Sequence, residues 1–462
     1  MRKRSQRSSK SRTARKPKSY TPASTAKASQ LPGGFLKAWQ ELLASYEPIA
    51  PKGRGRPARV SLSNLLAAMV FHFMNGAGTL AEHFAMLFDD SLNDSSCSSR
   101  RTRLSWEVFA QLMGRMLRPL ADKKLQPESF WRGWRLVALD GTQFSVANTP
   151  QVKRSAKKAN SRRGPAAFAK IVTGVLLEIG LHNPIAAAIG RTGQSEWELA
   201  RGLLVHLPKD ALLLADRLHG CAAFVREVLA AGQAVNRHFL IRARGQIKCK
   251  TVKRLKDGSR IVRVPVREKG NPRNIVQWLE LRSIRVMVQR KGHRPTPLHL
   301  WTSLLAPLTA PALELVELYG KRWEHELFYR QLKLQMRKSE LLQSHTVETG
   351  AQEIAAMLIA AALIASERAK AAGSEMPALR ISFVKLLELM RPLWLVLTLG
   401  DDLLAEWQKE ALTKRFQDQA RRCVTPPRRK RSCPRAVRQP VTGWPRLIKN
   451  QYWNEPITFN LT

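Results

Sequence analysis

The sequence predicts an α/β fold with helical segments on both sides of it. Between residues 134 and 242, short apolar runs alternate with turns and helical patterns, which is typical of a sheet whose strands are joined by helices. Apolar residues recur at helical spacing before this stretch, and again from Ala312 to about Phe416. The chain has 462 residues, 44% of them hydrophobic, enough for about two or three packed domains.

The first 125 residues are expected to hold a basic arm and then several short helices. Residues 1–30 contain ten Lys and Arg, no acid and few large apolar side chains, so this arm cannot build a core. The helices are predicted over residues 35–46, over 61–74, from the capping box of Thr79 and Glu82, and from Ser105 to Leu117. We expect a helical DNA-binding domain over 31–125, with an unrelated helical bundle as the alternative.

Arginines in this region favour the DNA-binding interpretation. The element Lys52-Gly53-Arg54-Gly55-Arg56-Pro57 resembles the core of an AT-hook, in which an extended backbone lets arginines such as Arg54 and Arg56 enter a narrow minor groove. A linker explains this element equally well. The last helix is preceded by Arg100, Arg101 and Arg103.

The first part of the α/β core is expected over residues 126–244. Strands are predicted at residues 135–139, 171–179, 185–189, 212–215 and 239–242. Residues 195–207 and 221–231 have the pattern of helices between these strands.

A basic, β-rich insertion is expected over residues 245–306, with turns at Asp257-Gly258 and Gly270-Asn271-Pro272. Residues 242–294 carry 17 basic and 3 acidic side chains. The core is expected to resume over residues 307–345. A helical C-terminal region over 346–420 would be interrupted near 373–377 and around 391–401, and would be followed by a basic, Pro-rich tail over 421–462.

The net charge makes a polyanion the expected partner. The chain carries 78 Lys and Arg against 35 Asp and Glu, a formal net charge of +43. Binding to phosphates would then depend strongly on salt. The apolar run Ile354–Ser366 is shorter than the ~20 residues that cross a bilayer, so we expect a buried helix and no membrane partner. No apolar segment follows the basic N-terminus, which favours the cytosol.

Several other functional classes are excluded by missing motifs. The five cysteines form no C-x-x-C pair and the ten histidines no H-x-x-x-H pair, so neither zinc pattern is present. No G-x-x-x-x-G-K-[ST] motif exists, which excludes a P-loop ATPase. Carboxylates remain as the metal ligands to consider.

Two aspartates stand at the predicted carboxyl ends of strands. Asp140 follows the run 136–139, and Asp216 follows the run 212–215. Ligands of open α/β sheets bind at this edge, although either aspartate could simply cap a turn. A hard cation such as Mg²⁺ is typically held by one or two carboxylates together with water and phosphate oxygens, and we expect a third acid in this site.

The third acid is found in a helical segment after residue 312. On one regular helix, Tyr319, Arg322, Glu326 and Lys333 fall within about 60° of arc, and Arg337 extends their stripe. Three apolar residues lie on another side: Phe328, Leu332 and Met336. The helix could therefore bury one face while it presents a phenol, cations and an acid on the other. An exposed face with ion pairs is the alternative.

The spacing Y-x(2)-R-x(3)-E-x(6)-K, with Trp323 directly after the arginine, resembles the signature of DDE transposases of the insertion-sequence four (IS4) group. Asp140 in Leu-Asp-Gly-Thr resembles the first catalytic aspartate of that group, Asp216 in Ala-Asp-Arg the second, and Glu326 the third acid. The resemblance spans about residues 35–445. The segment Arg217-Leu218-His219-Gly220 departs from it, since a shorter Asp-Arg-Gly-Phe stretch is common there.

This resemblance implies an RNase H-like core, a mixed sheet flanked by helices, and a cut-and-paste DNA transposase of a bacterial insertion sequence. Two Mg²⁺ ions about 3.5–4 Å apart, replaceable by Mn²⁺, would be held by Asp140, Asp216 and Glu326 for an in-line phosphodiester displacement. Such enzymes bind terminal inverted repeats, cleave the end, typically through a hairpin, and join it to target DNA.

The resemblance also implies roles for the remaining signature residues. Tyr319, Arg322 and Lys333, extended by Arg337, would grip phosphates near the cleaved end, and Trp323 would either stack in the end complex or lie in the core. A flipped base needs a stacking partner, for which Trp278 and Trp301 in the insertion are candidates.

Partners and location follow from the same resemblance. One element has two ends, so we expect a homodimer on DNA, with the helices from Arg391 onward as candidate contacts and no small-molecule substrate. The expected location is the bacterial cytoplasm, in association with the nucleoid. Two other functions stay open at this point: a nuclease of the same fold that cuts without joining, and a non-catalytic DNA-binding or architectural protein that would need none of the three acids.

Overall fold

The computed structural model describes residues 61–75, 77–88, 92–156, 158, 160–161, 164–232, 236–290, 294–336, 339–426 and 457–461. The predicted basic arm, the helix over residues 35–46, most of the basic tail and the candidate DNA contacts Arg54, Arg56 and Arg337 lie outside these ranges.

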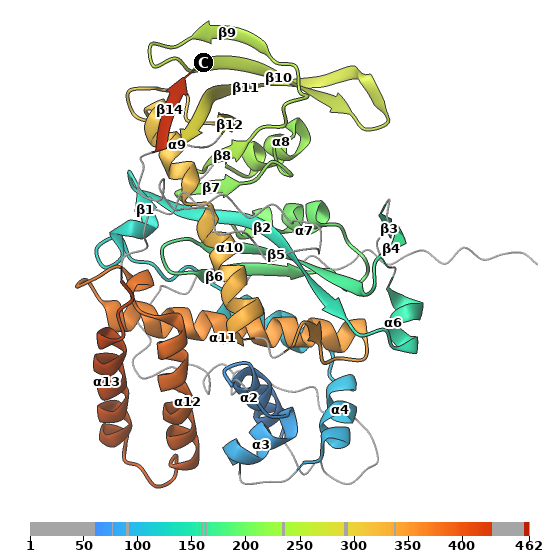
Figure 1. The fold of residues 1–462 in the computed structure, drawn as a ribbon, viewed down its shortest axis with the longest axis vertical. Helices are drawn as coiled ribbons and strands as arrows, with labels where there is room; N and C mark the ends of the chain where they lie inside the picture. Colours follow the sequence, from blue (N-terminus) through green and yellow to red (C-terminus); the bar gives the residue numbers. More distant parts are fainter. Residues whose placement is uncertain are drawn as a thin grey trace, which may run out of the picture.

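The centre of the molecule is a mixed sheet with the strand order β6-β5-β2-β7-β8 (Figure 1). Its strands are β2 (Trp134–Val146), β5 (Ala169–Glu178), β6 (Asn183–Ile189), β7 (Ala211–Ala215) and β8 (His238–Arg242). β5 runs antiparallel to both of its neighbours, whereas β2, β7 and β8 run parallel to one another. This order and direction are those of an RNase H-like sheet, so the predicted fold class is confirmed.

The predicted strands are all present, but β2 is longer than the sequence predicted. Its pairing with β7 ends at Leu139, whose partner is Ala215, while its pairing with β5 continues to Val146. Asp140 therefore lies inside β2, and its expected position at the end of the strand was wrong. The residues after Asp140 remain paired with β5, and this pairing keeps the strand extended. Asp140 instead marks the residue where β2 leaves β7.

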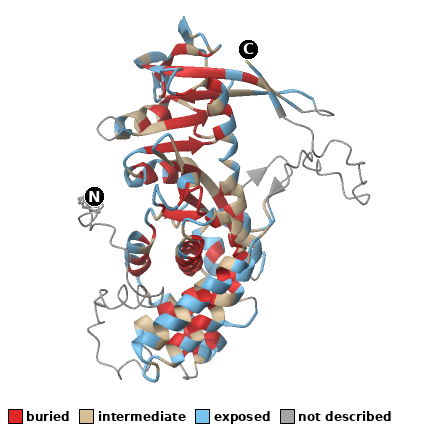
Figure 2. Ribbon diagram, turned by 90° about the vertical axis from the view of Figure 1, so that its left-hand side faces the viewer, coloured by how far each residue is buried: buried red, intermediate tan, exposed pale blue. Residues whose placement is uncertain are grey.

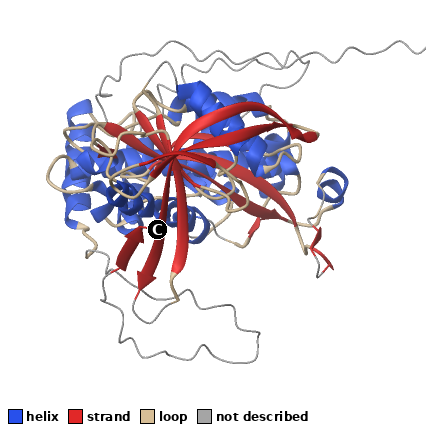
Figure 3. Ribbon diagram, turned by 90° about the horizontal axis from the view of Figure 1, so that it is seen from above, coloured by secondary structure: helices blue, strands red, loops and turns tan. Residues whose placement is uncertain are grey.

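The β-rich stretch extends the same sheet. Its strands are β9 (Lys250–Arg254), β10 (Arg260–Glu268), β11 (Asn271–Arg290) and β12 (Thr296–Thr302), and they continue the order from β8 as β12-β11-β10-β9. The predicted turns are confirmed, because Gly258 and Gly270 have φ values of +80° and +91°. Seen from above, the strands rotate progressively around one axis (Figure 3), as the twist of a large sheet requires.

Shorter elements complete the sheet region. They are β1 (Phe130–Trp131), β13 (Leu341–Leu342) and β14 (Ile457–Leu461), with a separate hairpin of β3 (Asn160–Ser161) and β4 (Gly164–Pro165), the 3-10 turn Pro127–Ser129 and the helix α6 (Pro150–Ser155).

Helices cover both faces of the sheet. α7 (Glu196–Leu203) and α8 (Ala222–Gly232) pack with Val137 and Leu139 of β2 on one face. α9 (Ala312–Gly320) packs with Leu136 and Ala138 on the other. The predicted helices at residues 195–207 and 221–231 are confirmed. The alternation along β2 decides the direction of the site residues, since Asp140 shares the face of Leu136 and Ala138.

Below the sheet lies a helical layer built from both ends of the described chain (Figure 1). Its helices are α2 (Leu62–His72), α3 (Leu80–Phe88), α4 (Asp94–Thr102), α5 (Trp106–Met116), α11 (Val347–Ala372), α12 (Phe383–Leu399) and α13 (Glu406–Arg422). Side chains of α2, α3 and α5 share one hydrophobic core with α11 and α12. Figure 2 colours the ribbon by burial, and buried residues (red) run through both the sheet and the helices. The N-terminal helices are therefore continuous with the core of the protein.

Capping side chains explain where several of these helices begin. Ser61 accepts a hydrogen bond from the backbone N–H of Asn64, and Ser105 caps α5 in the same way. Thr79 and Glu82 form the predicted capping box, with bonds of 2.8 and 3.2 Å.

α11 is the central helix of this layer. By length and composition it could cross a membrane, but 94% of its most apolar window is buried inside the protein. The predicted buried helix is confirmed.

α12 differs from the prediction. An interruption was expected around residues 391–401, but the helix runs through Pro392 and stops only at Gly400. A proline inside a helix costs about 3 kcal/mol. Burial of Met390, Trp394 and Leu397 against the helical core offsets this cost.

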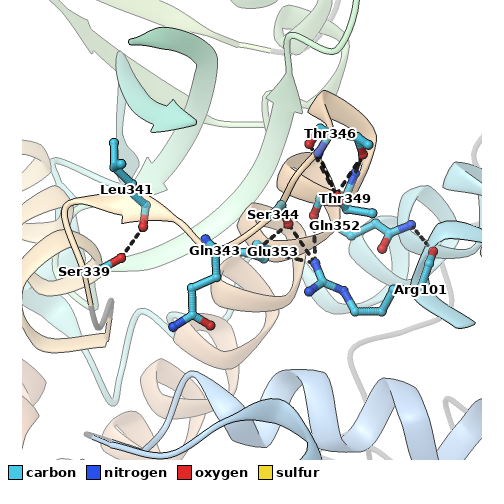
Figure 4. A network of polar contacts seen from close by, with 9 residues as sticks. All are labelled: Arg101, Ser339, Leu341, Gln343, Ser344, Thr346, Thr349, Gln352 and Glu353. Atoms are coloured by element: carbon cyan, nitrogen blue, oxygen red, sulfur yellow. Dashed lines mark hydrogen bonds and ion pairs between the residues drawn. The ribbon is translucent and has the colours of Figure 1, made fainter. Parts of the chain in front are cut away.

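A polar network joins α4 to α11 (Figure 4). Arg101 Nη2 donates to Ser344 Oγ at 2.9 Å and to the backbone oxygen of Thr349 at 3.0 Å, and it forms an ion pair with Glu353 at 3.5 Å. Gln352 Nε2 donates back to the Arg101 backbone oxygen at 3.0 Å. Arg101 therefore holds the helical layer together, whereas the sequence had placed it among arginines of a DNA-binding domain.

Arg101→Ala is expected to lower the free energy of unfolding by about 3 kcal/mol, because it removes three contacts of one guanidinium and leaves the nearly buried Glu353 without its ion-pair partner, with only the Gln343 N–H and the Ser344 hydroxyl bonded to it. Chemical denaturation measures this effect. Arg103→Ala, at an exposed position at the end of the same helix, is the control and should change stability by less than about 0.5 kcal/mol. Equal effects of the two substitutions would contradict the structural role of Arg101.

Candidate active site

Asp140 and Asp216 stand side by side on the sheet. Leu139 and Ala215 are partners in the parallel register of β2 and β7, and each aspartate is the next residue. Both aspartates lie on the face of the sheet that α9 covers. Side chains two residues apart in a strand point to the same face, and Ala138 and Leu214, two residues before the aspartates, pack with α9. The two carboxylates therefore come together through pairing of distant segments.

Asp216 is held by the turn that follows β7. Its Oδ1 accepts hydrogen bonds from the backbone N–H of Leu218 at 2.8 Å and from His219 Nδ1 at 2.9 Å. Burial opposes ionisation of Asp216, but these bonds outweigh it and lower the pKa below the usual value. The unusual segment after Asp216 thus supplies a buried histidine that fixes the carboxylate.

Gly220 explains how this turn fits. A Cβ on Gly220 would lie 2.0 Å from the backbone oxygen of Arg242, at the end of β8. Only glycine allows the turn to approach β8 so closely.

The third acid comes from a broken helix. α9 ends at Gly320, α10 (Trp323–Arg330) begins after a turn, and residues Gln331–Met336 form a π-helix. The four signature residues therefore do not share one regular helix, and that prediction was wrong. Glycine is a poor helix former, which favours the break at Gly320. π-helical turns occur frequently at functional sites.

Arg322 nevertheless brings the signature residues and the sheet together. Its Nη1 lies 3.2 Å from Asp140 Oδ2, and its Nη2 lies 3.5 Å from Glu326 Oε1. Tyr319 lies beside the same guanidinium, and burial raises the pKa of its phenol to about 12. Asp140, Glu326, Arg322 and Tyr319 thus form one cluster.

Two buried side chains of α10 fix this helix on the sheet. The ring of His325 bonds the backbone oxygen of Val175 at 3.0 Å, and the Tyr329 hydroxyl donates to the backbone oxygen of Asp140 at 2.8 Å. Asp140 and Val175 are partners in the β2–β5 register. The helix that carries Glu326 is therefore locked to the strand that carries Asp140. The sequence analysis missed both residues, although their i, i+4 spacing was a usable signal.

The remaining predicted residues lie in different environments. Lys333 lies over the ring of Phe144 on β2, 5.4 Å from its centroid. Trp323 is 43% exposed. Trp278 is also exposed, with Lys250 Nζ at 4.9 Å from its ring centroid. Trp301 is completely buried in the sheet core, so it cannot stack on a base and that prediction was wrong.

A fourth acid, Glu196, was also missed by the sequence analysis. It is the first residue of α7, and its carboxyl group lies against Gly141, the residue after Asp140.

The electrostatics of the cluster are dominated by Asp140. Burial and the nearby charge of Asp216 raise its pKa to about 6, although Arg322 opposes the shift. The folded protein therefore holds the Asp140 proton more tightly than the unfolded chain does, although the carboxyl group is still mostly ionised at pH 7.

Asp140→Asn is expected to stabilise the fold by about 1–3 kcal/mol above pH 6 and to have no such effect below pH 4. The pKa of Asp140 is higher in the folded protein than in the unfolded chain. As pH rises between these two values, the unfolded chain loses the proton first, and the folded state becomes less stable relative to it. The destabilisation is thus absent at low pH and complete above the folded pKa. Denaturation curves at pH 4 and pH 7.5 measure it, and an asparagine variant that is less stable at pH 7.5 would contradict this electrostatic account.

The fold is the one implied by the resemblance of the signature to DDE enzymes. A model of the transposase DDE domain family matches residues 131–363. The chain therefore belongs to this family, and the resemblance recognised in the signature is confirmed.

Individual relatives agree with this assignment. The chain is 28% identical over 219 residues to transposase InsG for insertion sequence element IS4 of Escherichia coli K12, covering 46% of this chain and 48% of that protein. It is 28% identical over 116 residues to the putative transposase InsZ of the same organism, covering 24% and 38%. The chain thus matches about half or less of the length of these relatives.

Among solved structures, the chain was matched to piggyBac transposase in its synaptic complex with hairpin DNA. The two chains are 9% identical and superpose with a TM-score of 0.43, over 82% of this chain and 80% of that one.

Proposed function

We propose that the protein is a cut-and-paste DNA transposase of a bacterial insertion sequence. The observation that carries this proposal is the convergence of the three acids of the family pattern. Asp140 and Asp216 follow the last paired residues of two adjacent strands, and Arg322 bridges Asp140 to Glu326.

The three carboxylates suit divalent cations, because they offer oxygen ligands and negative charge. Hard cations prefer carboxylate oxygens. Burial and Asp216 raise the pKa of Asp140 although Arg322 forms an ion pair with it, so Arg322 compensates the negative charge of the site only in part. In the part of the chain that the structure describes, no three His, Cys, Asp or Glu side chains already stand close enough to share one ion. Arg322 occupies the space between Asp140 and Glu326.

We propose that Asp140, Asp216 and Glu326 hold two Mg²⁺ ions, or Mn²⁺, once Arg322 turns from Asp140 toward a phosphate. When bound, the cations stabilise the attacking and leaving oxygens of an in-line phosphodiester displacement. His219 keeps Asp216 ionised and oriented, and Tyr329 and His325 keep α10 in register with β2.

The signature side chains suit the recognition of a DNA end. The planar guanidinium of Arg322 can bind a phosphate through two nitrogens. A tyrosine is protonated at neutral pH, and burial raises the pKa of Tyr319 further, to about 12, so its hydroxyl can donate to a phosphate oxygen. Lys333 adds a positive charge from the π-helix, and the exposed ring of Trp323 can stack on a base.

The partners are part of the same proposal. The terminal inverted repeats and the target DNA would meet a chain of net charge +43, and the edge strand β9 is exposed throughout and carries three basic residues, Lys250, Lys253 and Arg254. Two ends require two active sites, so we propose a homodimer on DNA that works in the bacterial cytoplasm at the nucleoid, and cleavage through a hairpin.

The test is a DNA reaction with purified full-length protein and DNA that carries the ends of its own element. Mg²⁺-dependent cleavage followed by joining to a target supports the transposase. Cleavage without joining would favour a nuclease of the same fold. Binding without reaction in Mg²⁺ or Mn²⁺ would favour an architectural protein and overturn the proposal.

A further inference from the structure

A fourth carboxylate lies at the site, outside the signature and outside the two aspartate motifs. Glu196 is the first residue of α7, and Ser195 caps this helix by accepting the backbone N–H of Glu198 at 3.3 Å. The Glu198 side chain accepts the Ser195 backbone N–H at 2.8 Å in return. The capping box thus fixes the start of α7 through its neighbours and leaves the Glu196 side chain for another role.

Gly141 brings Glu196 next to Asp140. A Cβ on Gly141 would lie 2.3 Å from Cδ of Glu196 and 2.6 Å from its Oε1, so this approach requires glycine. The backbone N–H of Gly141 donates to Asp140 Oδ1 at 2.9 Å. Asp140 points to one face of β2 and Gly141 to the other. The missing side chain at Gly141 therefore lets the Glu196 carboxyl group lie against the backbone of β2, at the residue next to Asp140.

His219 bonds Asp216 and also contributes to the electrostatics of Glu196. Its imidazole is completely buried and bonds Asp216 through Nδ1, while Nε2 has no hydrogen-bond partner within the described residues. Burial raises the pKa of Glu196, and the nearby charge of Asp216 raises it further, while His219 opposes the shift. Glu196 thus interacts electrostatically with both aspartates of the site.

We propose that Glu196 is a fourth metal-holding carboxylate, which binds a divalent cation together with Asp140 and Asp216. The inference rests on the proposed function. Asp140 lies where β2 leaves β7, Asp216 directly follows β7, and Glu196 begins α7 against Gly141. Arg322 contacts Asp140, and His219 contacts Asp216. A hard cation with oxygen ligands matches this excess of negative charge. Side-chain rotations of Glu196 and Asp140 would bring their oxygens to one ion.

The alternative is that Glu196 only fills space against Gly141. Glu196→Gln keeps the shape of the side chain and removes its charge, so it separates the two roles. Glu198→Gln is the matched control, because it removes one charge from the same turn of α7, while glutamine still serves in a capping box. Thermal unfolding of both variants checks that they fold.

The experiment is an Mn²⁺ titration of the full-length protein followed by electron paramagnetic resonance, with and without DNA ends. We expect Glu196→Gln to weaken Mn²⁺ binding by about tenfold or more, and Glu198→Gln to match the wild type. Glu196→Asp, which keeps the charge, should recover part of the affinity. Mg²⁺-dependent cleavage should need a correspondingly higher metal concentration in Glu196→Gln.

The outcomes distinguish this inference from the function on which it rests. If Glu196→Gln binds Mn²⁺ as the wild type does while Asp140→Ala abolishes cleavage, the role of Glu196 is wrong and the transposase stands. If neither substitution affects metal binding or cleavage, the metal site and the proposed function both fail.

Discussion

Asp216→Ala should reduce cleavage and strand joining by about 10³-fold or more while leaving DNA affinity unchanged. The reason lies in its position at the end of β7, next to Asp140 across the register, with His219 and a backbone N–H holding its carboxylate ionised. Removing one negative charge does not weaken the attraction of the protein to phosphates. The substitution should therefore lower the rates of cleavage and joining without lowering DNA affinity. Gel-shift titration and a cleavage assay in Mg²⁺ measure the two quantities.

Asp418→Ala is the control for this loss. Asp418 lies on an exposed face of α13, and its removal changes the net charge by the same amount. It should cleave and join as the wild type does. Residual cleavage by Asp216→Ala within tenfold of the wild type would mean that Asp216 is not a ligand of the reacting centre.

Arg322→Ala should reduce cleavage by about 10²-fold or more, with a smaller loss of DNA affinity. The guanidinium touches two acids of the site at 3.2 and 3.5 Å, so it both compensates Asp140 and is placed to turn to a phosphate. Its loss removes the group that opposes the burial of Asp140 and the nearby charge of Asp216, and we therefore expect the pKa of Asp140 to rise further. The pH at which cleavage reaches half of its maximum should increase in this variant.

Two matched variants make the Arg322 result specific. Arg330→Ala removes the same charge from an exposed position of α10 and should lower cleavage less than about threefold. Arg322→Lys keeps the charge but cannot reach two carboxylates at once, so it should recover only part of the activity. Full activity of Arg322→Lys would contradict the bridging role.

Much of the fold could be predicted because its signals are local. The short apolar run 212–215 gives β7, and Ser61, Ser105 and Ser195 each begin a helix as capping chemistry requires. The three acids could also be predicted, because Asp140 and Asp216 each follow an apolar run and Glu326 lies within the signature spacing.

The parts that were wrong depend on contacts between distant segments. β2 continues past Asp140 because β5 pairs with it, and α12 continues past Pro392 because the helical core buries it. The break at Gly320 and the π-helix after Arg330 depend on how α10 docks on the sheet. Local propensity cannot report such tertiary contacts.

Only the site residues that lie in local sequence motifs could be predicted. Glu196 and His219 come to the acids through the sheet register and through glycine contacts at Gly141 and Gly220, which no single segment encodes. Trp301 was a candidate by type, but its position in the core of the sheet removes it. The chemical type of a residue can be read from the sequence, whereas the residues that surround it depend on the fold.

The central claim is that Glu326, carried by a broken helix, works with Asp140 and Asp216 in one reacting centre. The most direct measurement is strand joining of pre-cleaved element ends to target DNA by Glu326→Gln, beside Glu317→Gln at an exposed position of α9. We predict that Glu326→Gln binds the ends and joins none of them, while Glu317→Gln joins as the wild type does. Joining by Glu326→Gln at the wild-type rate would contradict the account.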